Sequence, residues 1–259
     1  MYIFEDNLPH PIMLKEERQA YIIKQINVHN KVLSSDLSVQ LAVSEDTVRR
    51  DLNELAESGK ILKVYGGALS KSFHYPFQQN DVYAKDSKKI IVHKTMNLIK
   101  SGMVLLAGGG TTMIEWARSV PDNIECTVFT VSPLVGLELT ERAGVEVILI
   151  GGQLSKNSHI NTGALTINLL ADIKVDLCIM GTNGLSYEGG VTESDWEVVQ
   201  VKKAMIKSSQ KTAVISIGEK LGSVQKMKIC GLNAISYLIT DLDRSDPILA
   251  PYKNEVQVI

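Results

Sequence analysis

The 259-residue sequence has few cysteines, no long apolar run and no surplus of positive charge. Its three cysteines, Cys126, Cys178 and Cys230, are too widely spaced for a CxxC metal site or a disulfide framework, which favours a reducing cytoplasm. No apolar run approaches the roughly 20 residues needed to cross a bilayer. The segment MYIFEDNLPHPIML at the start contains no Lys or Arg, which argues against a signal peptide. We therefore expect a cytoplasmic protein without a membrane partner.

The charge balance excludes nucleic-acid binding through a broad basic field. The chain has 27 Lys and Arg against 29 Asp and Glu, a formal net charge of −2. Within residues 15–65 we count 8 basic and 8 acidic side chains, 8 − 8 = 0. Any contact with DNA must come from the placement of a few basic side chains.

Signatures of metal and nucleotide sites are also missing. The five histidines are scattered without ligand spacing, so we expect no metal and no cofactor. The glycine-rich stretch LLAGGGTTMIEWA is not a P-loop, because no lysine follows Gly110. It is not a dinucleotide fingerprint either, because the last glycine of that motif is replaced by Met113.

The pattern of apolar and polar residues changes along the chain and predicts four segments. Residues 14–70 are predicted to be an all-α winged helix-turn-helix domain, and residues 71–87 a polar linker. Residues 88–245 are predicted to be an α/β domain with a mostly parallel sheet and helices on both faces, followed by a C-terminal tail at 246–259.

The first segment predicts three helices and a hairpin. Helices are expected over 15–29, from Ser34 or Ser35 as an N-cap, and after Ser44 as an N-cap, with a strand at 61–64 that turns at Gly66-Gly67. In the third helix Val48, Leu52 and Leu55 form the buried stripe.

The opposite side of the third helix carries polar residues that suit a DNA major groove. Arg50 and Asn53 project outward, with Thr47 and Arg49 on the flanks. An alternative interpretation is a solvated helix with an Asp46–Arg50 pair. Asp51 is predicted to orient an arginine or a neighbouring helix. The candidate DNA-binding residues are Ser35, Ser44, Thr47, Arg49, Arg50, Asn53 and Lys63.

The second domain predicts a ligand site at the carboxyl ends of its strands. Strand-like runs at 103–107, 127–131, 145–150, 175–180, 212–216 and 235–240 alternate with helices at 88–100, 112–119, 133–143, 163–171 and 193–209. Loops after parallel strands converge on one edge, and the glycine loop before residue 111 offers free N–H groups to an anion. The alternative is a tight turn without a ligand. The candidate effector-binding residues are Gly109, Gly110, Thr111, Thr112, Ser132, Gly151, Gly152, Gly181, Asn183 and Lys220.

Residues 14–68 resemble the helix-turn-helix of the DeoR family of bacterial transcription regulators. The resemblance rests on Arg18, Ile22, Ile26, Ser44, Thr47, Val48, Arg49, Arg50, Asp51 and Leu52, and on the wing Lys63-Val64-Tyr65-Gly66-Gly67-Ala68. Residues 88–241 resemble the sensor domain of that family, which has a ribose-5-phosphate-isomerase-like fold. The resemblance implies a repressor of a carbohydrate operon, with operator DNA and a small phosphorylated metabolite as partners. Because residues 15–65 are neutral, we expect a homodimer or homotetramer.

Departures from the family pattern leave two alternatives open. Ala107, Val131 and Ile217 stand where the family has Asp, Asn and Asp, so the sugar end of the site is altered or vestigial. An isomerase would need a carboxylate base, but Asn183 and Gly184 occupy the positions of the acids in the isomerase. Only Glu188, Glu193 or Asp195 could substitute, and we assign no catalytic residue.

Overall fold

The computed structural model describes residues 13–70 and 83–259, and the chain divides into two compact units at Phe77/Gln78. The predicted linker therefore falls mostly on residues 71–82, outside the described residues. Its last three residues are helical, because α5 begins at Lys85. The domain boundary that the sequence predicts near residue 70 is compatible with this division into two units.

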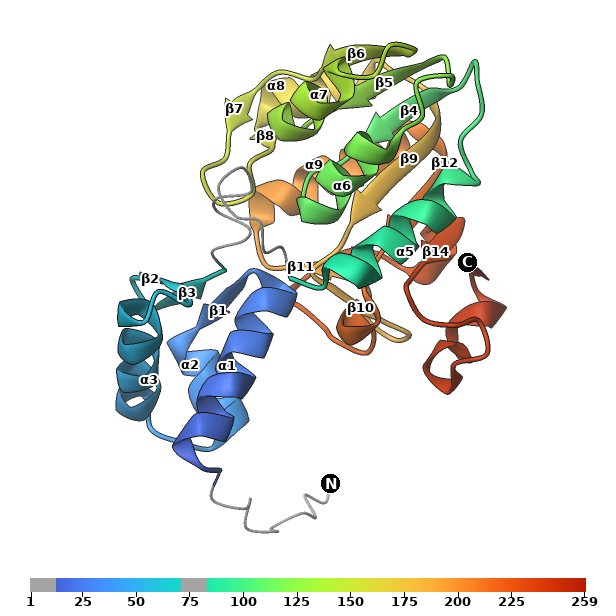
Figure 1. The fold of residues 1–259 in the computed structure, drawn as a ribbon. Helices are drawn as coiled ribbons and strands as arrows, with labels where there is room; N and C mark the ends of the chain where they lie inside the picture. Colours follow the sequence, from blue (N-terminus) through green and yellow to red (C-terminus); the bar gives the residue numbers. More distant parts are fainter. Residues whose placement is uncertain (1–12, 71–82) are drawn as a thin grey trace. The chain divides into compact units, whose positions relative to one another are not determined.

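The first unit is a winged helix built from three helices and a small antiparallel sheet. Its elements are α1 (Lys15–His29), β1 (Lys31–Leu33), α2 (Ser34–Leu41), α3 (Glu45–Glu57), β2 (Leu62–Val64) and β3 (Gly67–Leu69) (Figure 1). The strands lie in the order β1-β3-β2. Val48, Leu52 and Leu55 of α3 are fully buried against Ile22 and Ile26 of α1, as the spacing predicted.

The start of α2 corrects the predicted serine cap. Leu33 is the N-cap residue, Ser34 is already helical, and no side chain caps the helix. Leu33 pairs with Gly67 in the sheet, and the Ser34 amide donates to the Gly66 carbonyl at 2.8 Å. The wing turn thus satisfies an amide at the start of the helix.

The second unit has a seven-stranded parallel sheet in the order β15-β14-β12-β9-β4-β5-β6. The strands are β4 (Val104–Ala107), β5 (Cys126–Thr130), β6 (Val145–Leu149), β9 (Val175–Gly181), β12 (Ser209–Ile215), β14 (Tyr237–Ile239) and β15 (Gln257–Val258). Neighbouring strands run in the same direction throughout. This confirms the predicted sheet.

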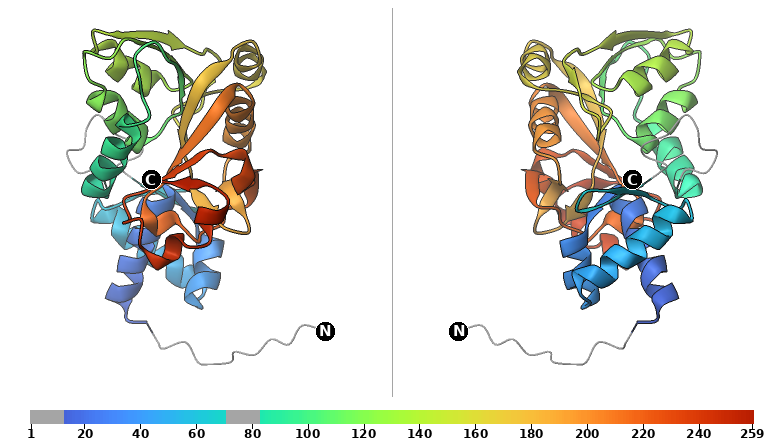
Figure 2. Two further views of the ribbon diagram at one scale, coloured as in Figure 1. Left: turned by 90° about the vertical axis from the view of Figure 1, so that its right-hand side faces the viewer. Right: turned by 90° about the vertical axis from the view of Figure 1, so that its left-hand side faces the viewer.

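Helices cover both faces of this sheet, as Figures 1 and 2 show. One face packs on α5 (Lys85–Met96), α6 (Thr111–Ser119) and α7 (Pro133–Thr140) through residues such as Leu105 and Ile179. The other face packs on α8 (Ala164–Ala171) and α9 (Trp196–Lys207) through residues such as Leu106 and Met180. Alternate residues of one strand point to opposite faces of the sheet. Because helices bury both faces, each strand is apolar along its whole length.

Short strands that local periodicity did not predict complete the unit. A three-stranded antiparallel sheet joins β10 (Gly184–Ser186), β11 (Gly190–Glu193) and β13 (Met227–Cys230), and β7 (Gln153–Leu154) pairs with β8 (Asn161–Thr162). Because β11 occupies residues 190–193, α9 begins at Trp196 rather than at the predicted residue 193.

The predicted C-terminal tail is wrong as a description of residues 246–259. They form two short 3-10 helices and β15, which pairs in parallel with β14. Tyr252, Val256 and Val258 are buried in the core, and the Ile259 amide donates to the Leu238 carbonyl at 2.9 Å. These residues complete the sheet edge, which gives them a structural role.

Candidate DNA-binding surface and candidate effector site

The third helix of the winged unit presents its polar side to solvent. Ser44 is its N-cap, as predicted, and the Ser44 hydroxyl accepts the Thr47 amide at 3.2 Å. Arg49, Arg50 and Asn53 are exposed, while Thr47 is half-buried. A capped helix with one apolar side and exposed arginines near its first turns has the form that enters a major groove.

The two arginines of this helix have different surroundings. Arg49 donates to Glu45 at 3.1 Å and to Asp46 at 3.2 Å, so Asp46 pairs with Arg49 and not with Arg50. Arg50 forms no ion pair within residues 13–70 and 83–259. To bind DNA, the Arg49 guanidinium would have to leave the carboxylates of Glu45 and Asp46, whereas the Arg50 guanidinium can bind a new acceptor directly.

The wing is joined to the same helix by two of the candidate residues. Lys63 of β2 donates its ammonium proton to the side-chain oxygen of Asn53. Tyr65, at the turn between β2 and β3, is fully exposed. Tyr65 was not among the candidate DNA-binding residues, although its place beside Gly66-Gly67 already indicated a turn. Ser35 is exposed and lies 3.4 Å from Asp36 through its hydroxyl, and it caps no helix.

A buried ion pair holds the third helix on the first. Arg18 Nε donates to Asp51 at 2.6 Å, and the side chains are 13% and 2% exposed. Arg18 Nη2 donates to the other carboxylate oxygen of Asp51 at 3.2 Å, and the Gln19 amide adds a third donor at 3.4 Å. Asp51 therefore orients an arginine and a neighbouring helix, as predicted.

The glycine loop of the second unit lies between β4 and α6, at the carboxyl end of the sheet. A β-carbon on Gly109 would lie 2.4 Å from Ile160 and 3.3 Å from Ser132, and Gly110 has a φ of 112°. Only glycine fits these two positions. Thr111 and Thr112 form the first turn of α6 and are half-exposed, so the helix N-terminus opens at this edge.

Three other candidates have contacts that stabilise the fold. Ser132 is 1% exposed and caps α7, where its hydroxyl accepts the Val135 amide at 3.4 Å. A β-carbon on Gly152 would lie 2.0 Å from the Thr166 hydroxyl, and that hydroxyl donates to the Gly151 carbonyl at 2.8 Å. The turn at Gly151-Gly152 therefore requires glycine for close packing, with or without a ligand.

Lys220 lies against the loop that follows β9. Its ammonium donates to the Thr182 carbonyl at 3.0 Å, which brings Lys220 beside the candidates Gly181 and Asn183. Burial lowers the pKa of Lys220 to about 8. The structure thus joins Lys220 to a loop that lies 38 positions earlier in the sequence.

A second lysine, which the sequence reasoning missed, lies close to Lys220. Lys88 of α5 is 7% exposed, and its ammonium donates to the Tyr83 carbonyl at 2.6 Å. Burial, with Lys220 as a second cause, lowers the pKa of Lys88 to about 7. The signal was the spacing 88, 91, 92 and 95, which places a lysine on the buried stripe of the helix. In the described chain neither lysine is paired with a carboxylate.

These pKa shifts predict that stability rises with pH. The unfolded chain keeps the Lys88 proton up to about pH 10.5, whereas the folded chain releases it near pH 7. Folding therefore becomes more favourable as pH rises through this window, by up to about 1.4 kcal/mol per pH unit for one proton. Urea unfolding between pH 7.5 and 9.5 should show a shallower dependence for Lys88→Met than for wild type. Equal slopes would contradict the burial of Lys88 near Lys220 and Glu115.

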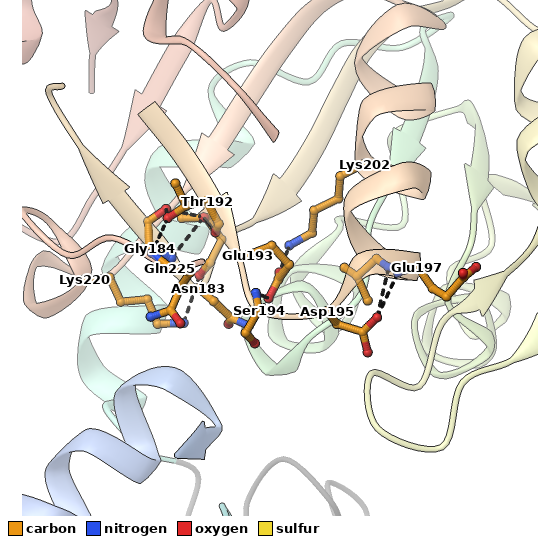
Figure 3. A network of polar contacts seen from close by, with 12 residues as sticks. Asn183, Gly184, Thr192, Glu193, Ser194, Asp195, Glu197, Lys202, Lys220 and Gln225 are labelled. Carbon is orange, nitrogen blue, oxygen red and sulfur yellow. Dashed lines mark hydrogen bonds and ion pairs between the residues drawn. The ribbon is translucent and has the colours of Figure 1, made fainter. Parts of the chain in front are cut away.

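A network beneath the same edge argues against an isomerase base (Figure 3). Glu193 is 3% exposed and accepts from Lys202 at 2.6 Å, from the Ser194 amide at 2.9 Å and from Asn183. Burial alone would raise the pKa of Glu193, but Lys202 and the hydrogen bonds outweigh it and hold the pKa below its usual value. Such a carboxylate is a weak proton acceptor.

The two other acids considered as substitutes do not serve as a base in this arrangement. Asp195 caps α9 and accepts the Glu197 amide at 3.0 Å. Glu188 is exposed in the turn between β10 and β11. No three of the His, Cys, Asp and Glu side chains that the structure describes gather into a metal site. No helix in the described ranges is long and apolar enough to cross a membrane.

A winged helix with an exposed arginine on its third helix, joined to an α/β unit with a lysine-lined edge, defines a DNA-binding transcriptional regulator with a sensor domain. A model of the DeoR-like helix-turn-helix domain matches residues 18–73, and a model of the DeoR C-terminal sensor domain matches residues 84–242. The chain belongs to the DeoR family, which confirms the resemblance expected from the sequence.

The relatives with curated names are regulators, not enzymes. The chain is 32% identical over 232 residues to the HTH-type transcriptional repressor GlcR of Bacillus subtilis, which covers 88% of this chain and 89% of that one. It is 27% identical over 231 residues to the glycerol-3-phosphate regulon repressor of Escherichia coli, covering 88% and 92%. It is also 27% identical over 237 residues to the L-fucose operon activator of Escherichia coli, covering 88% and 96%.

Solved structures with a similar fold are more distant. A tetrameric eIF2B-beta2-delta2 complex from Chaetomium thermophilum has a TM-score of 0.48 at 13% identity, covering 92% of this chain and 72% of that one. Ribose 5-phosphate isomerase A from Methanocaldococcus jannaschii has a TM-score of 0.39 at 15% identity, covering 53% and 54%.

Proposed function

We propose that this regulator represses a carbohydrate-metabolism operon in the cytoplasm and that a small phosphorylated metabolite relieves the repression. The observation that carries the effector is a pair of lysines, Lys88, which is buried, and Lys220, which is half-buried. Among the described residues their ammonium groups hydrogen-bond to backbone carbonyls and to no carboxylate. A phosphate group would supply the missing negative charge, and the N-terminus of α6 would add N–H donors.

On the DNA side, we propose that α3 lies in the major groove of double-stranded operator DNA. Thr47, Arg49 and Arg50 lead, and Arg50 suits the two acceptors of a guanine edge. The wing with Lys63 follows the phosphate backbone, together with Asn53, to which it is hydrogen-bonded. Ser35 and Ser44, near the starts of α2 and α3, are proposed as phosphate contacts.

We further propose that the chain acts as a homodimer or homotetramer. Its DNA-binding segment is neutral, so a second half-site is needed for tight binding. The sheet edge at β6 supports this, because Ile148 and Leu149 are exposed there, as is Leu137 on the adjacent α7. Exposed aliphatic side chains on an unpaired edge strand are typical of a protein interface. Sedimentation of the full chain at micromolar concentration tests this, and a monomer would contradict it.

A thermal-shift screen of sugar phosphates and other phosphate monoesters tests the effector. At a hundredfold excess over Kd, one ligand is expected to raise Tm by about 5–10 °C in wild type. Lys220→Met should abolish the shift, and Lys207→Met, on the exposed end of α9, should preserve it. The same compound should weaken binding to promoter DNA.

The absence of a Tm shift with every phosphate monoester would contradict the effector proposal. Ala107, Val131 and Ile217 are buried apolar residues, so the site offers no carboxylate or amide at those three positions. If promoter DNA binds and no phosphate monoester shifts Tm, the sensor has lost its ligand. The effector proposal would then be wrong, and the chain would regulate through DNA binding alone.

A further inference from the structure

Tyr83, just before α5, is hydrogen-bonded both to Lys88 and to Glu219, the residue that precedes Lys220. Its carbonyl accepts the Lys88 ammonium at 2.6 Å. Its hydroxyl donates to the two carboxylate oxygens of Glu219, at 2.9 and 2.8 Å. Glu219 directly precedes Lys220 in the short 3-10 helix Gly218–Lys220. The Tyr83 backbone is therefore held by Lys88, and the Tyr83 side chain by the carboxylate next to Lys220.

Tyr83 lies close in the chain to the connection between the two units. The residues before Tyr83 connect the sensor unit to the winged helix unit. Tyr83 is the first residue of the sensor unit that the structure describes. Tyr83 therefore lies next to the stretch of chain that joins the two units.

An anion at the lysine pair would compete with the Tyr83 carbonyl. The Lys88 ammonium is almost fully buried, so few acceptors can reach it. A phosphate oxygen carries charge and is a stronger acceptor than a neutral carbonyl. The approaching anion would also repel the Glu219 carboxylate, which holds the Tyr83 hydroxyl.

We propose that Lys88 is a positioning residue that alternates between two acceptors, the Tyr83 carbonyl when the effector site is empty and the anion when it is filled. This inference rests on the proposed effector site and states how that site is coupled to the rest of the chain. Anion binding releases Tyr83, and the hydrogen bond from Tyr83 to Glu219 resists the release. By linkage, a contact that favours the empty state lowers affinity for the anion.

The electrostatics of the cluster support the exchange. Lys88 faces Lys220 from the 3-10 helix and Glu115 from α6, and burial together with Lys220 lowers the pKa of Lys88 to about 7. Two close ammonium groups disfavour each other's charge, and an anion between them removes that penalty. Lys88 therefore gains more from the anion than from the carbonyl it leaves.

Calorimetric titration of the full chain with inorganic phosphate tests the exchange at a fixed pH of 7.5. Tyr83→Phe removes only the hydroxyl and leaves the carbonyl, so it should bind phosphate about threefold to tenfold more tightly, the value of one hydrogen bond. Lys88→Met should bind at least about tenfold more weakly. Tyr237→Phe, whose hydroxyl bonds with Lys211 away from the site, is the matched control and should equal wild type.

Hydrogen exchange supplies a second readout that a merely structural role would not give. Phosphate should increase deuterium uptake in the peptide 83–88 and decrease it in the peptide 109–113. If Lys88→Met loses phosphate while Tyr83→Phe gains nothing and peptide 83–88 becomes protected, the effector site stands and the exchange is wrong. If wild type binds no phosphate, or if Lys88→Met and Lys220→Met both bind like wild type, the effector site fails and the exchange fails with it.

Discussion

Arg50→Ala is expected to weaken binding to operator DNA by about 10- to 100-fold at constant salt. Arg50 is exposed on the side of α3 opposite the buried stripe, and no carboxylate of the described chain engages its guanidinium. If α3 binds DNA as proposed, removal of the side chain deletes a contact with DNA and breaks no ion pair among the described residues. Fluorescence anisotropy with promoter DNA measures the effect, and Tm should stay at the wild-type value.

Salt dependence distinguishes a base contact from a phosphate contact. If Arg50 reads a base edge, the slope of log affinity against log salt is unchanged and discrimination between sites falls. If it contacts a phosphate, the slope changes by about one unit for all sequences. Arg118→Ala, which alters an ion-paired arginine in the sensor unit, is the matched control. Unchanged operator affinity in Arg50→Ala would show that α3 does not read DNA.

Arg49→Ala should have a smaller effect than Arg50→Ala. Its guanidinium already bonds to Glu45 and Asp46, so DNA would replace two carboxylates instead of water. This contrast was absent from the sequence, where the alternative interpretation paired Asp46 with the other arginine. Both pairings fit helical spacing, and only side-chain conformation separates them.

The long elements could be predicted because their information is local. The first helix was predicted over 15–29 and has these bounds, and the parallel strands were visible as buried runs bounded by glycine loops. Some of the strands that escaped prediction pair with distant residues, as Lys31 does with Leu69 and Val191 with Cys230. A strand of three or four residues has too few positions to show a period.

The candidate effector site shows the same division between local and distant information. Gly109 and Lys220 could be predicted because strand ends and glycine loops are visible in the sequence. Lys88 was missed, because KDSKKII is also typical of a solvated first helical turn, and its spacing with Ile91, Val92 and Thr95 marks a buried stripe only once α5 packs on α6. Ser132 and Gly152 were predicted as ligand contacts, and their packing shows that a glycine or hydroxyl at a strand end also serves the fold.

Asp51→Ala is expected to destabilise the winged unit by about 3–5 kcal/mol, since it leaves the Arg18 charge without a partner at a buried helix interface. That loss is comparable to the whole stability of many small domains, so DNA binding should disappear with folding. Scanning calorimetry should show the winged-unit transition shifted or lost, with the sensor transition retained. The exposed pair Lys15–Glu54 links the same two helices, and Glu54→Ala should leave the transition nearly unchanged.

A double replacement separates folding from recognition at this pair. Arg18→Met with Asp51→Leu replaces the ions by apolar groups of similar size, and such exchanges are often neutral or stabilising. The double variant should therefore recover both the transition and DNA binding, because neither residue projects from the exposed side of α3. Recovery of the transition without DNA binding would mean that Arg18 or Asp51 also acts at the DNA. Recovery of neither would mean that the pair specifies the packing of α1 on α3 in a way that apolar contact cannot replace.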